Sequence, residues 1–108
     1  MENWIKIAST EDCPIGRGIT ALIDEEQIAV FHIDKDEWYA VQNLCPHENQ
    51  MVISRGLCGD QNGEPKVACP LHKNSFSLKT GCHLGEGHDW KLKTFELKIE
   101  DNLVFIKT

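Results

Sequence analysis

Short stretches of alternating apolar and polar residues run through most of this chain, and turn-forming residues separate them. Alternation with a period of two is the pattern of a strand that buries one face. The stretches are 4–7, 19–23, 27–33, 38–43, 65–68, 75–78, 95–99 and 103–106. Hairpin turns are predicted at 24–26 and, between the two C-terminal stretches, at Asp101-Asn102. No longer run keeps the spacing of an amphipathic helix without a Gly, a Pro or a turn cluster interrupting it. The pattern predicts an all-β fold, built as a small antiparallel sandwich or partly open barrel.

The chain is 108 residues long, the usual size of one domain, so we expect residues 1–108 to fold as a single unit. Its formal net charge is −6, from 17 acidic and 11 basic residues. A nucleic-acid-binding protein normally needs a basic face, so this charge argues against that class. An acidic surface suits docking on a basic protein partner instead.

The first residues of the chain have neither the basic nor the apolar segment of an export signal. Apolar runs such as 28–31 are far shorter than the ~20 residues that a membrane-spanning helix needs. We therefore expect a cytoplasmic protein with no membrane segment. The five cysteines agree with this, because disulfide scaffolds are typical of secreted proteins and favour an even number of cysteines.

Two segments rich in turn-forming residues, 45–63 and 69–75, interrupt the strand pattern and are predicted to be loops. The first begins Cys45-Pro46-His47, and the second begins Cys69-Pro70-Leu71-His72. Each segment supplies one thiol and one imidazole, and a proline stiffens the chain beside each cysteine. In a reducing compartment, clustered Cys and His side chains more often bind a metal than form disulfides.

This ligand set has the composition of a Rieske centre, in which two Cys side chains hold one iron of a [2Fe–2S] cluster and two His side chains hold the other. Two loops can supply that arrangement if their cysteines converge on one iron and their histidines on the other. A Cys2His2 zinc site is an alternative, although the C-x-H and C-x2-H spacings fit zinc poorly. A disulfide between Cys45 and Cys69 is another, as is a set of four ordinary loop and core residues.

The motif CPH…CPLH resembles that of the Rieske ferredoxin family. The resemblance implies a small β fold with a cluster-binding subdomain of two loops, here about 44–50 and 68–76. It also implies that Cys45 and Cys69 hold the inner iron. His47 and His72 would hold the outer iron and lie exposed near the tip. A chain of this kind transfers one electron at a time and has no catalytic residue of its own.

Four positions depart from the pattern of high-potential Rieske proteins: Gln50, Leu71, Asn74 and Phe76. Gln50 and Leu71 stand where those proteins carry two cysteines, joined by a disulfide that clamps the cluster. Asn74 and Phe76 stand where they carry Ser and Tyr hydroxyl groups. Fewer hydrogen bonds to the cluster sulfurs stabilise the reduced state less, so we expect a reduction potential toward the low end of the Rieske range.

Lys73 is a further departure, because ordinary Rieske ferredoxins usually have Gly directly after the second His ligand. With this lysine, the long segment 54–81 resembles the small-subunit family of assimilatory NAD(P)H-dependent nitrite reductases. That resemblance implies an oxidoreductase subunit working beside a large siroheme, flavin and iron–sulfur subunit that reduces nitrite to ammonium. Two alternatives stay open: a free-standing Rieske ferredoxin that supplies a ring-hydroxylating dioxygenase, and a subunit whose role is structural assembly.

Three cysteines lie outside the motif and are expected to be free thiols: Cys13, Cys58 and Cys82. The pair Cys82-His83 followed by His88 suggests a second metal site, but no fourth ligand is apparent. His32 lies in an alternating stretch, and we expect it to pack in the core or face solvent rather than bind a metal.

Overall fold

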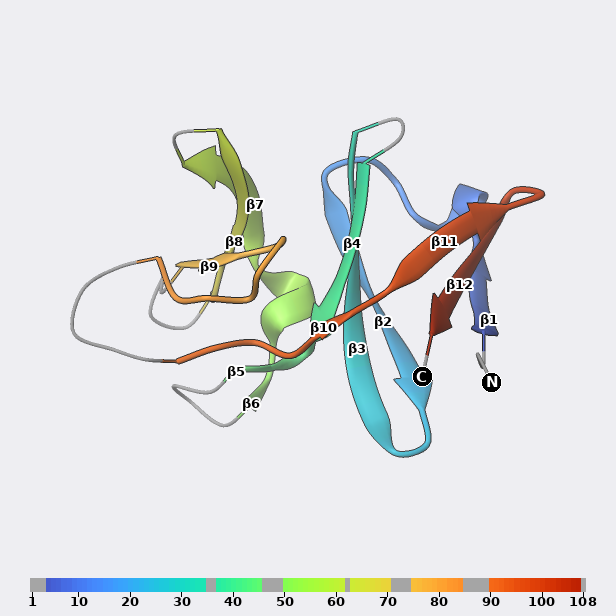
Figure 1. Ribbon diagram of the computed structural model, residues 1–108, viewed down its shortest axis with the longest axis horizontal. Coiled ribbons are helices and arrows are strands. Elements are labelled where there is room, and N and C mark those ends of the chain that lie inside the picture. The colour runs from blue at the N-terminus through green and yellow to red at the C-terminus, as the bar shows by residue number, and fades with distance from the viewer. Residues whose placement is uncertain are drawn as a thin grey trace.

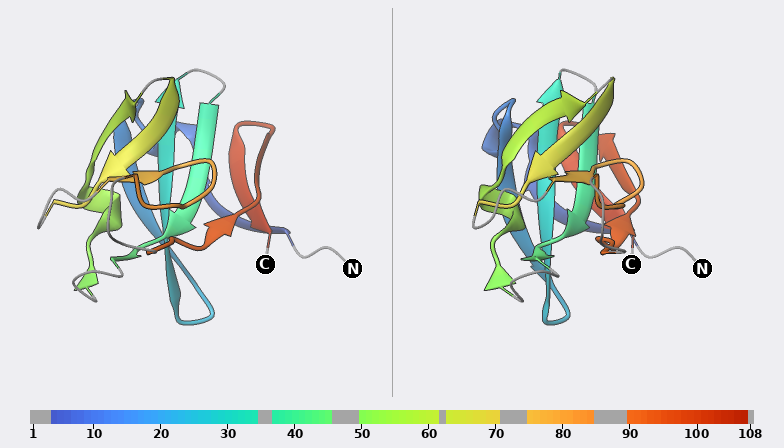
Figure 2. Two further views of the ribbon diagram at one scale, coloured as in Figure 1. Left: turned by 60° about the vertical axis from the view of Figure 1, so that its left-hand side comes forward. Right: turned by 90° about the vertical axis from the view of Figure 1, so that its left-hand side faces the viewer.

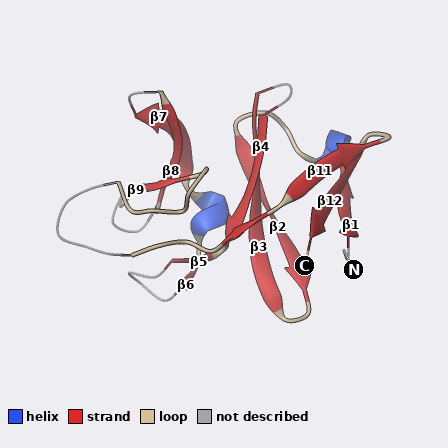
Figure 3. Ribbon diagram, in the orientation of Figure 1, coloured by secondary structure: helices blue, strands red, loops and turns tan. Residues whose placement is uncertain are grey.

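The computed structural model describes residues 4–34, 37–45, 50–61, 63–70, 75–84 and 90–107 (Figure 1). Within these ranges every regular element is a strand, except two 3₁₀ helices of 3 residues each (Figure 3). The elements are β1 (Trp4–Ser9), η1 (Thr10–Asp12), β2 (Arg17–Ile23), β3 (Glu26–Asp34), β4 (Glu37–Gln42), β5 (Leu44–Cys45), β6 (Gln50–Met51), η2 (Ile53–Arg55), β7 (Leu57–Gln61), β8 (Glu64–Ala68), β9 (Ser75–Ser77), β10 (Thr94–Phe95), β11 (Leu97–Glu100) and β12 (Leu103–Lys107). Neither helix in the described ranges is long and apolar enough to cross a membrane.

A central four-stranded sheet, in the order β10-β4-β3-β2, separates two other parts of the fold (Figures 1 and 2). On one side lies the three-stranded sheet β1-β12-β11. On the other side lie the three-stranded sheet β7-β8-β9 and the two-stranded sheet β5-β6. The strand pairs of the described ranges are antiparallel. The predicted all-β antiparallel fold is confirmed, and its described strands do not close into a barrel.

Strand β3 is buried on both faces, because each face of the central sheet packs on a different part of the fold. Ala29 and Phe31 belong to one core cluster, on the side of β7-β8-β9. Ile28 and Val30 belong to the other cluster, on the side of β1-β12-β11. Successive side chains of a strand point in opposite directions, so neighbours in the sequence reach opposite cores. The continuous apolar run 28–31 is therefore typical of a strand at the centre of a fold, where both faces of the strand are buried.

Two hairpins have two-residue turns in which both residues adopt the left-handed conformation: Asp24 and Glu25 (φ 47° and 69°), and Asp101 and Asn102 (φ 53° and 62°). Such turns match the twist of the paired strands and favour Asn, Asp and Gly. The predicted turn 24–26 is one residue too long, because its last residue already pairs with the end of β2. The predicted turn between the two C-terminal strands is confirmed.

The segment 45–63, predicted to be a loop, contains regular structure. Strand β6 pairs with β5, η2 follows it, and β7 pairs with β8. The prediction missed β7 because its residues do not alternate, and Leu57 at its start is 77% exposed. Backbone hydrogen bonds hold such a strand without a clear apolar face. The only local signal was the Asn62-Gly63 dipeptide, which is typical of two-residue hairpin turns.

Candidate metal centre

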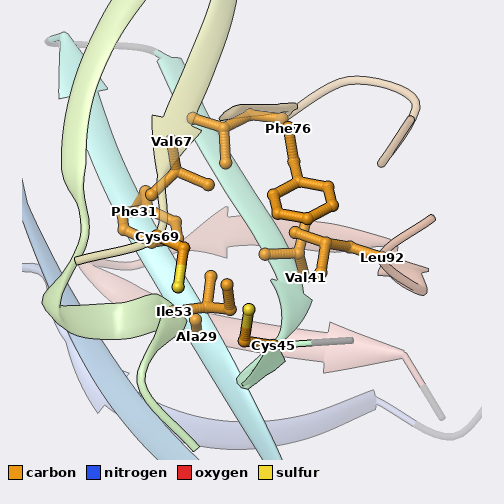
Figure 4. Close-up of a cluster of buried hydrophobic side chains, with 10 residues drawn as sticks. Ala29, Phe31, Val41, Cys45, Ile53, Val67, Cys69, Phe76 and Leu92 are labelled. Atoms are coloured by element: carbon orange, nitrogen blue, oxygen red, sulfur yellow. The ribbon is translucent and has the colours of Figure 1, made fainter. Parts of the chain in front are cut away.

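Cys45 and Cys69 meet in one buried cluster although they belong to different parts of the chain. Cys45 ends β5, and Cys69 directly follows β8. Both residues are 0% exposed, and both belong to the core cluster drawn in Figure 4. In that view their sulfur atoms flank Ile53, and the other side chains around them are apolar. Two thiols from separate segments, placed in one water-free cluster, suit a metal that prefers thiolate ligands.

The other two predicted ligands, His47 and His72, lie outside the described residues, so the set of four ligands stays a prediction. All five cysteines lie in the described residues and none of them forms a disulfide, so the disulfide alternative for Cys45 and Cys69 is wrong. Among the described residues, no group of three or more His, Cys, Asp or Glu side chains is placed to hold a metal ion. A metal centre at the two cysteines therefore needs further ligands, and the sequence places one histidine shortly after each cysteine.

Asn43 anchors the chain just before Cys45. It is 2% exposed, and both ends of its side-chain amide are hydrogen-bonded. Its Nδ2 donates to Oε1 of Gln27 at 3.0 Å, and its Oδ1 accepts from the Ser54 backbone N–H at 2.7 Å. Its backbone N–H donates to the Gln27 carbonyl and its carbonyl accepts from the Ile53 N–H, both at 3.0 Å. Through these four bonds of its side chain and backbone, the buried Asn43 ties β3, η2 and the first cysteine segment together.

Gln42 fixes the same segment to the C-terminal part of the chain. Its Nε2 donates to the Leu44 carbonyl at 2.7 Å, and its Oε1 accepts from the Lys93 backbone N–H at 2.7 Å. The Gln42 backbone N–H also donates to the Lys93 carbonyl at 2.8 Å. Leu44, the residue directly before Cys45, is thus fixed by a side chain of the central sheet.

Ser77 anchors the chain on the far side of the second cysteine segment. It is 0% exposed, and its Oγ accepts from the backbone N–H groups of Lys79 and Thr80, both at 3.2 Å. Its own N–H donates to the Cys82 carbonyl at 2.9 Å, and its carbonyl accepts from the Gly81 N–H at 2.8 Å. These four bonds close the tight turn after β9, which returns the chain toward the core.

Gly56 allows η2 to approach the strand that leads to Cys69. A Cβ at this position would overlap the carbonyl oxygen of Ala68 and crowd the side chain of Val67. Glycine alone avoids this overlap, so any other residue would push η2 away from β8. The close approach sets the spacing between the two cysteine-bearing segments, because Ile53 of η2 packs in the cluster that contains both cysteines.

Two ionisable side chains packed against this cluster stay uncharged at neutral pH. Burial raises the pKa of the Cys58 thiol. Burial, a hydrogen bond to Glu37 and the negative charge of that carboxylate raise the pKa of Tyr39 to about 12. The Tyr39 hydroxyl donates to Glu37 Oε2 at 2.7 Å. Neither group therefore adds negative charge beside the two buried cysteines.

The histidines of the described residues take part in packing. His32 stacks on Trp38 with ring centroids 3.8 Å apart, and its Nδ1 lies 2.7 Å from the Cys13 carbonyl oxygen, so Nδ1 carries the donated proton. The His83 ring lies edge-on to the rings of Phe76 and Trp90, each at 5.5 Å between centroids. Of the suggested second site, Cys82 is exposed and His83 packs among aromatic rings, while His88 lies outside the described residues.

Sequence reasoning missed Asn43 and Ser77, the two buried polar residues of the described ranges. Both residue types are common in turns, so their burial has no local signature. Their position is the only available signal: one stands shortly before the first motif and the other shortly after the second.

Known proteins match this chain over nearly its whole length. Residues 3–107 match the family of Rieske-like [2Fe–2S] domains. Over 108 residues the chain is 32% identical to the nitrite reductase (NADH) small subunit of Escherichia coli (strain K12), and the match covers 99% of each chain. Over 103 residues, 95% of this chain, it is 36% identical to a part of the nitrite reductase NAD(P)H large subunit of Klebsiella oxytoca that makes up 11% of that protein.

A dioxygenase ferredoxin and a solved structure complete the comparison. The chain is 31% identical to the ferredoxin component of the naphthalene 1,2-dioxygenase/salicylate 5-hydroxylase systems of Ralstonia sp, over 98% of this chain and 96% of that one. The NMR structure of the E. coli protein NirD superposes with a TM-score of 0.90 at 32% identity, covering 100% of this chain and 98% of that one.

Proposed function

This chain belongs to the family of Rieske-like [2Fe–2S] domains, and on that premise we propose that it is the electron-transfer small subunit of an assimilatory NAD(P)H nitrite reductase. In this role residues 1–108 form one domain that passes electrons within a complex. A large siroheme, flavin and iron–sulfur subunit reduces nitrite to ammonium. The observation that carries the proposal is a pair of fully buried cysteines, Cys45 and Cys69, in a chain that matches a nitrite reductase small subunit over 99% of its length.

The described residues fit a [2Fe–2S] cluster at its two-cysteine end. Cys45 and Cys69 would hold one iron, and His47 and His72 would hold the other. The chemistry that such a cluster supplies is reversible one-electron transfer. The chain contributes an apolar cluster that excludes water around the two thiols. It also holds both cysteine-bearing segments by hydrogen bonds of the buried side chains Asn43 and Ser77, which limits the movement of these segments.

Nitrite reduction itself is assigned to the large subunit. Conversion of nitrite to ammonium needs several electrons and a site that binds nitrogen oxides, and we assign neither to this chain. In the Klebsiella oxytoca large subunit, a region similar to this chain belongs to the same polypeptide. Covalent attachment there supports a working contact between the two parts in this protein.

Replacing His72 with alanine is expected to lower the NADH-dependent nitrite reduction of the complex to the rate measured without the small subunit. The imidazole is a predicted iron ligand, and its loss leaves an iron with an incomplete ligand set. The measurement is nitrite consumption by the reconstituted complex, with the rhombic electron paramagnetic resonance signal of the reduced small subunit recorded in parallel.

Co-purification with the large subunit is the control, because a side chain that serves only as an iron ligand should not be needed for assembly. A variant that lacks the signal but supports unchanged nitrite reduction would contradict electron transfer and favour the structural-assembly role. A variant that no longer binds the large subunit would show that the histidine acts in assembly.

The reduction potential is expected near ~−150 mV rather than ~+300 mV. The positions that carry a clamping disulfide and hydroxyl groups in high-potential relatives are Gln50, Leu71, Asn74 and Phe76 here. Fewer hydrogen bonds to the cluster sulfurs make reduction less favourable. Redox titration monitored by the same resonance signal measures the potential, and a value well above zero would contradict this reasoning.

A free-standing ferredoxin for a ring-hydroxylating dioxygenase is the second candidate. It is favoured by the 31% identity to the Ralstonia ferredoxin over 98% of this chain. The partner distinguishes the two: co-purification with a large siroheme flavoprotein supports the first, and pairing with a ferredoxin reductase and an oxygenase supports the second. A cytoplasmic location is part of the proposal, and the absence of a disulfide among the five cysteines suits a reducing compartment.

A further inference from the structure

A shallow groove of about 250 Å³ lies where the tip of the β2–β3 hairpin approaches the small sheet β5-β6. Its lining includes Asp24, Glu25, Glu26, Gln42, Leu44 and Met51. Figure 2 shows the hairpin tip and β6 at the same end of the molecule in both views. The β11–β12 turn lies away from this end (Figure 1).

The groove is continuous with the segment that carries Cys45. Leu44 directly precedes that cysteine and pairs with Met51 across β5 and β6. Gln42 reaches from the central sheet to bond the Leu44 carbonyl at 2.7 Å, so this wall of the groove is held in place. Met51 is 43% exposed, which leaves an apolar side chain in water at the rim. A protein that binds here comes close to Cys45, and electron exchange requires such proximity.

The groove also carries negative charge. Asp24 and Glu25 are exposed, and in the described part of the chain no ion pair involves either carboxylate. Glu26 pairs with Lys93 at 3.5 Å, with side chains 43% and 61% exposed, and pairs of this kind contribute little. A complementary partner face therefore carries Lys or Arg side chains around an apolar patch.

We propose that this groove is the docking surface for a basic face of the large nitrite reductase subunit, with Asp24 and Glu25 attracting the partner and Met51 packing against it. The proposal rests on the proposed function and deepens it by assigning the surface through which the two subunits meet. Charge attraction steers association and positions the partner, while the apolar contact slows dissociation.

The test compares two double variants of the cluster-loaded chain: Asp24→Lys/Glu25→Lys at the groove and Glu100→Lys/Asp101→Lys at the distant β11–β12 turn. Both replace two carboxylates with two ammonium groups at a hairpin end: Asp24 and Glu25 are the two turn residues of the first hairpin, while Glu100 ends β11 and Asp101 is the first turn residue of the second. Each also places a lysine at an aspartate with left-handed φ, 47° for Asp24 and 53° for Asp101. The strain is matched at this aspartate only, because Glu25 is also left-handed (φ 69°) while Glu100 lies in a strand and pairs with Lys98 at 3.5 Å. The free energy of unfolding of each variant is therefore measured beside its binding, so that a difference in binding between equally folded variants reports position.

The measurement is the dissociation constant between each variant and the purified large subunit, at low and at high ionic strength. We expect about tenfold weaker binding for the groove variant at low salt and less than about twofold change for the distant variant. In ~1 M salt, where charges are screened within about 3 Å, the groove variant should approach the wild type. Met51→Ala should weaken binding at both salt concentrations, because it removes most of the apolar contact without adding a charge.

The outcomes separate this proposal from the proposed function. Failure of the cluster-loaded wild type to bind the large subunit would contradict the proposed function. Binding by the wild type and equal binding by both double variants would overturn the docking surface alone. A groove variant that changes self-association in sedimentation, with binding to the large subunit unchanged, would assign the groove to a second copy of this chain and also overturn the proposal. The resonance signal should be the same in every variant.

Discussion

Cys69→Ala should leave the chain unable to hold a [2Fe–2S] cluster. The thiolate of Cys69 is one of the two proposed ligands of the inner iron, and the residue is 0% exposed in an apolar cluster. No water or replacement side chain can complete the ligand set there without opening the core. We expect iron and acid-labile sulfide contents near zero, no visible absorption and no rhombic resonance signal after reduction with dithionite. Zinc content measured on the wild type at the same time tests the zinc alternative.

Cys58→Ala is the matched control. Cys58 packs against the same core cluster, but burial raises the pKa of its thiol, and it is not among the proposed ligands. This variant should keep iron, sulfide and the signal. Retention of the signal by Cys69→Ala would exclude Cys69 as a ligand. Loss in both variants would mean that the core tolerates no thiol deletion, and the ligand assignment would lose its support.

Asn43→Ala should lower the free energy of unfolding by about 2–4 kcal/mol. Truncation leaves the part-buried N–H of Ser54 and Oε1 of Gln27 without their partner, and an unsatisfied group costs up to about 1–3 kcal/mol as its burial increases. This is a large part of the ~5–15 kcal/mol that stabilises a typical domain. Because Asn43 anchors the segment that leads to Cys45, the loaded variant should also release its cluster faster. Denaturant unfolding and the decay of visible absorption measure the two effects.

A double-mutant cycle with Gln27→Ala isolates the side-chain bond between the two residues. Gln27→Ala removes the acceptor of Asn43 Nδ2 but leaves the 2.7 Å bond from the Ser54 N–H intact, so its effect should be the smaller of the two. The double variant should lose less than the sum of the single losses, because the shared bond is counted twice in that sum. Additive losses, or cluster release at the wild-type rate, would contradict the anchoring role of Asn43.

Local pattern and the folded arrangement agree where a strand buries apolar side chains. The alternating stretches around 19–23, 27–33 and 103–106 became strands β2, β3 and β12, with shifts of a few residues at their ends. The C-terminal turn could be predicted because Asp101 and Asn102 are residue types that adopt the left-handed conformation easily. Strand β7 could not be predicted, because a strand held by backbone hydrogen bonds need not have an alternating order of side chains.

The candidate site shows the same division. The four ligands could be proposed from the sequence because Cys and His are rare, and because each Cys is followed by a proline and then, within three residues, by a His. The anchors Asn43 and Ser77 were not, because a polar residue in a turn-rich segment looks the same whether it is buried or exposed. Met51 and the hairpin tip at Asp24 and Glu25 are at least 26 positions apart in the sequence and share no motif, so only the tertiary structure shows that they line one groove.

Residue chemistry and order alone thus specify an all-β chain, two segments that each offer a thiol and an imidazole, and a negative net charge. These properties are local or additive, so they need no knowledge of distant contacts. Folding adds what depends on contacts between distant segments. It places Cys45 and Cys69 in one cluster and buries β3 between two cores. It also gives the Asn43 side chain its hydrogen-bond partners in β3 and η2, and it brings an acidic hairpin tip beside Met51. Long-range packing produces each of these, because residues far apart in the chain become neighbours only when the sheets assemble.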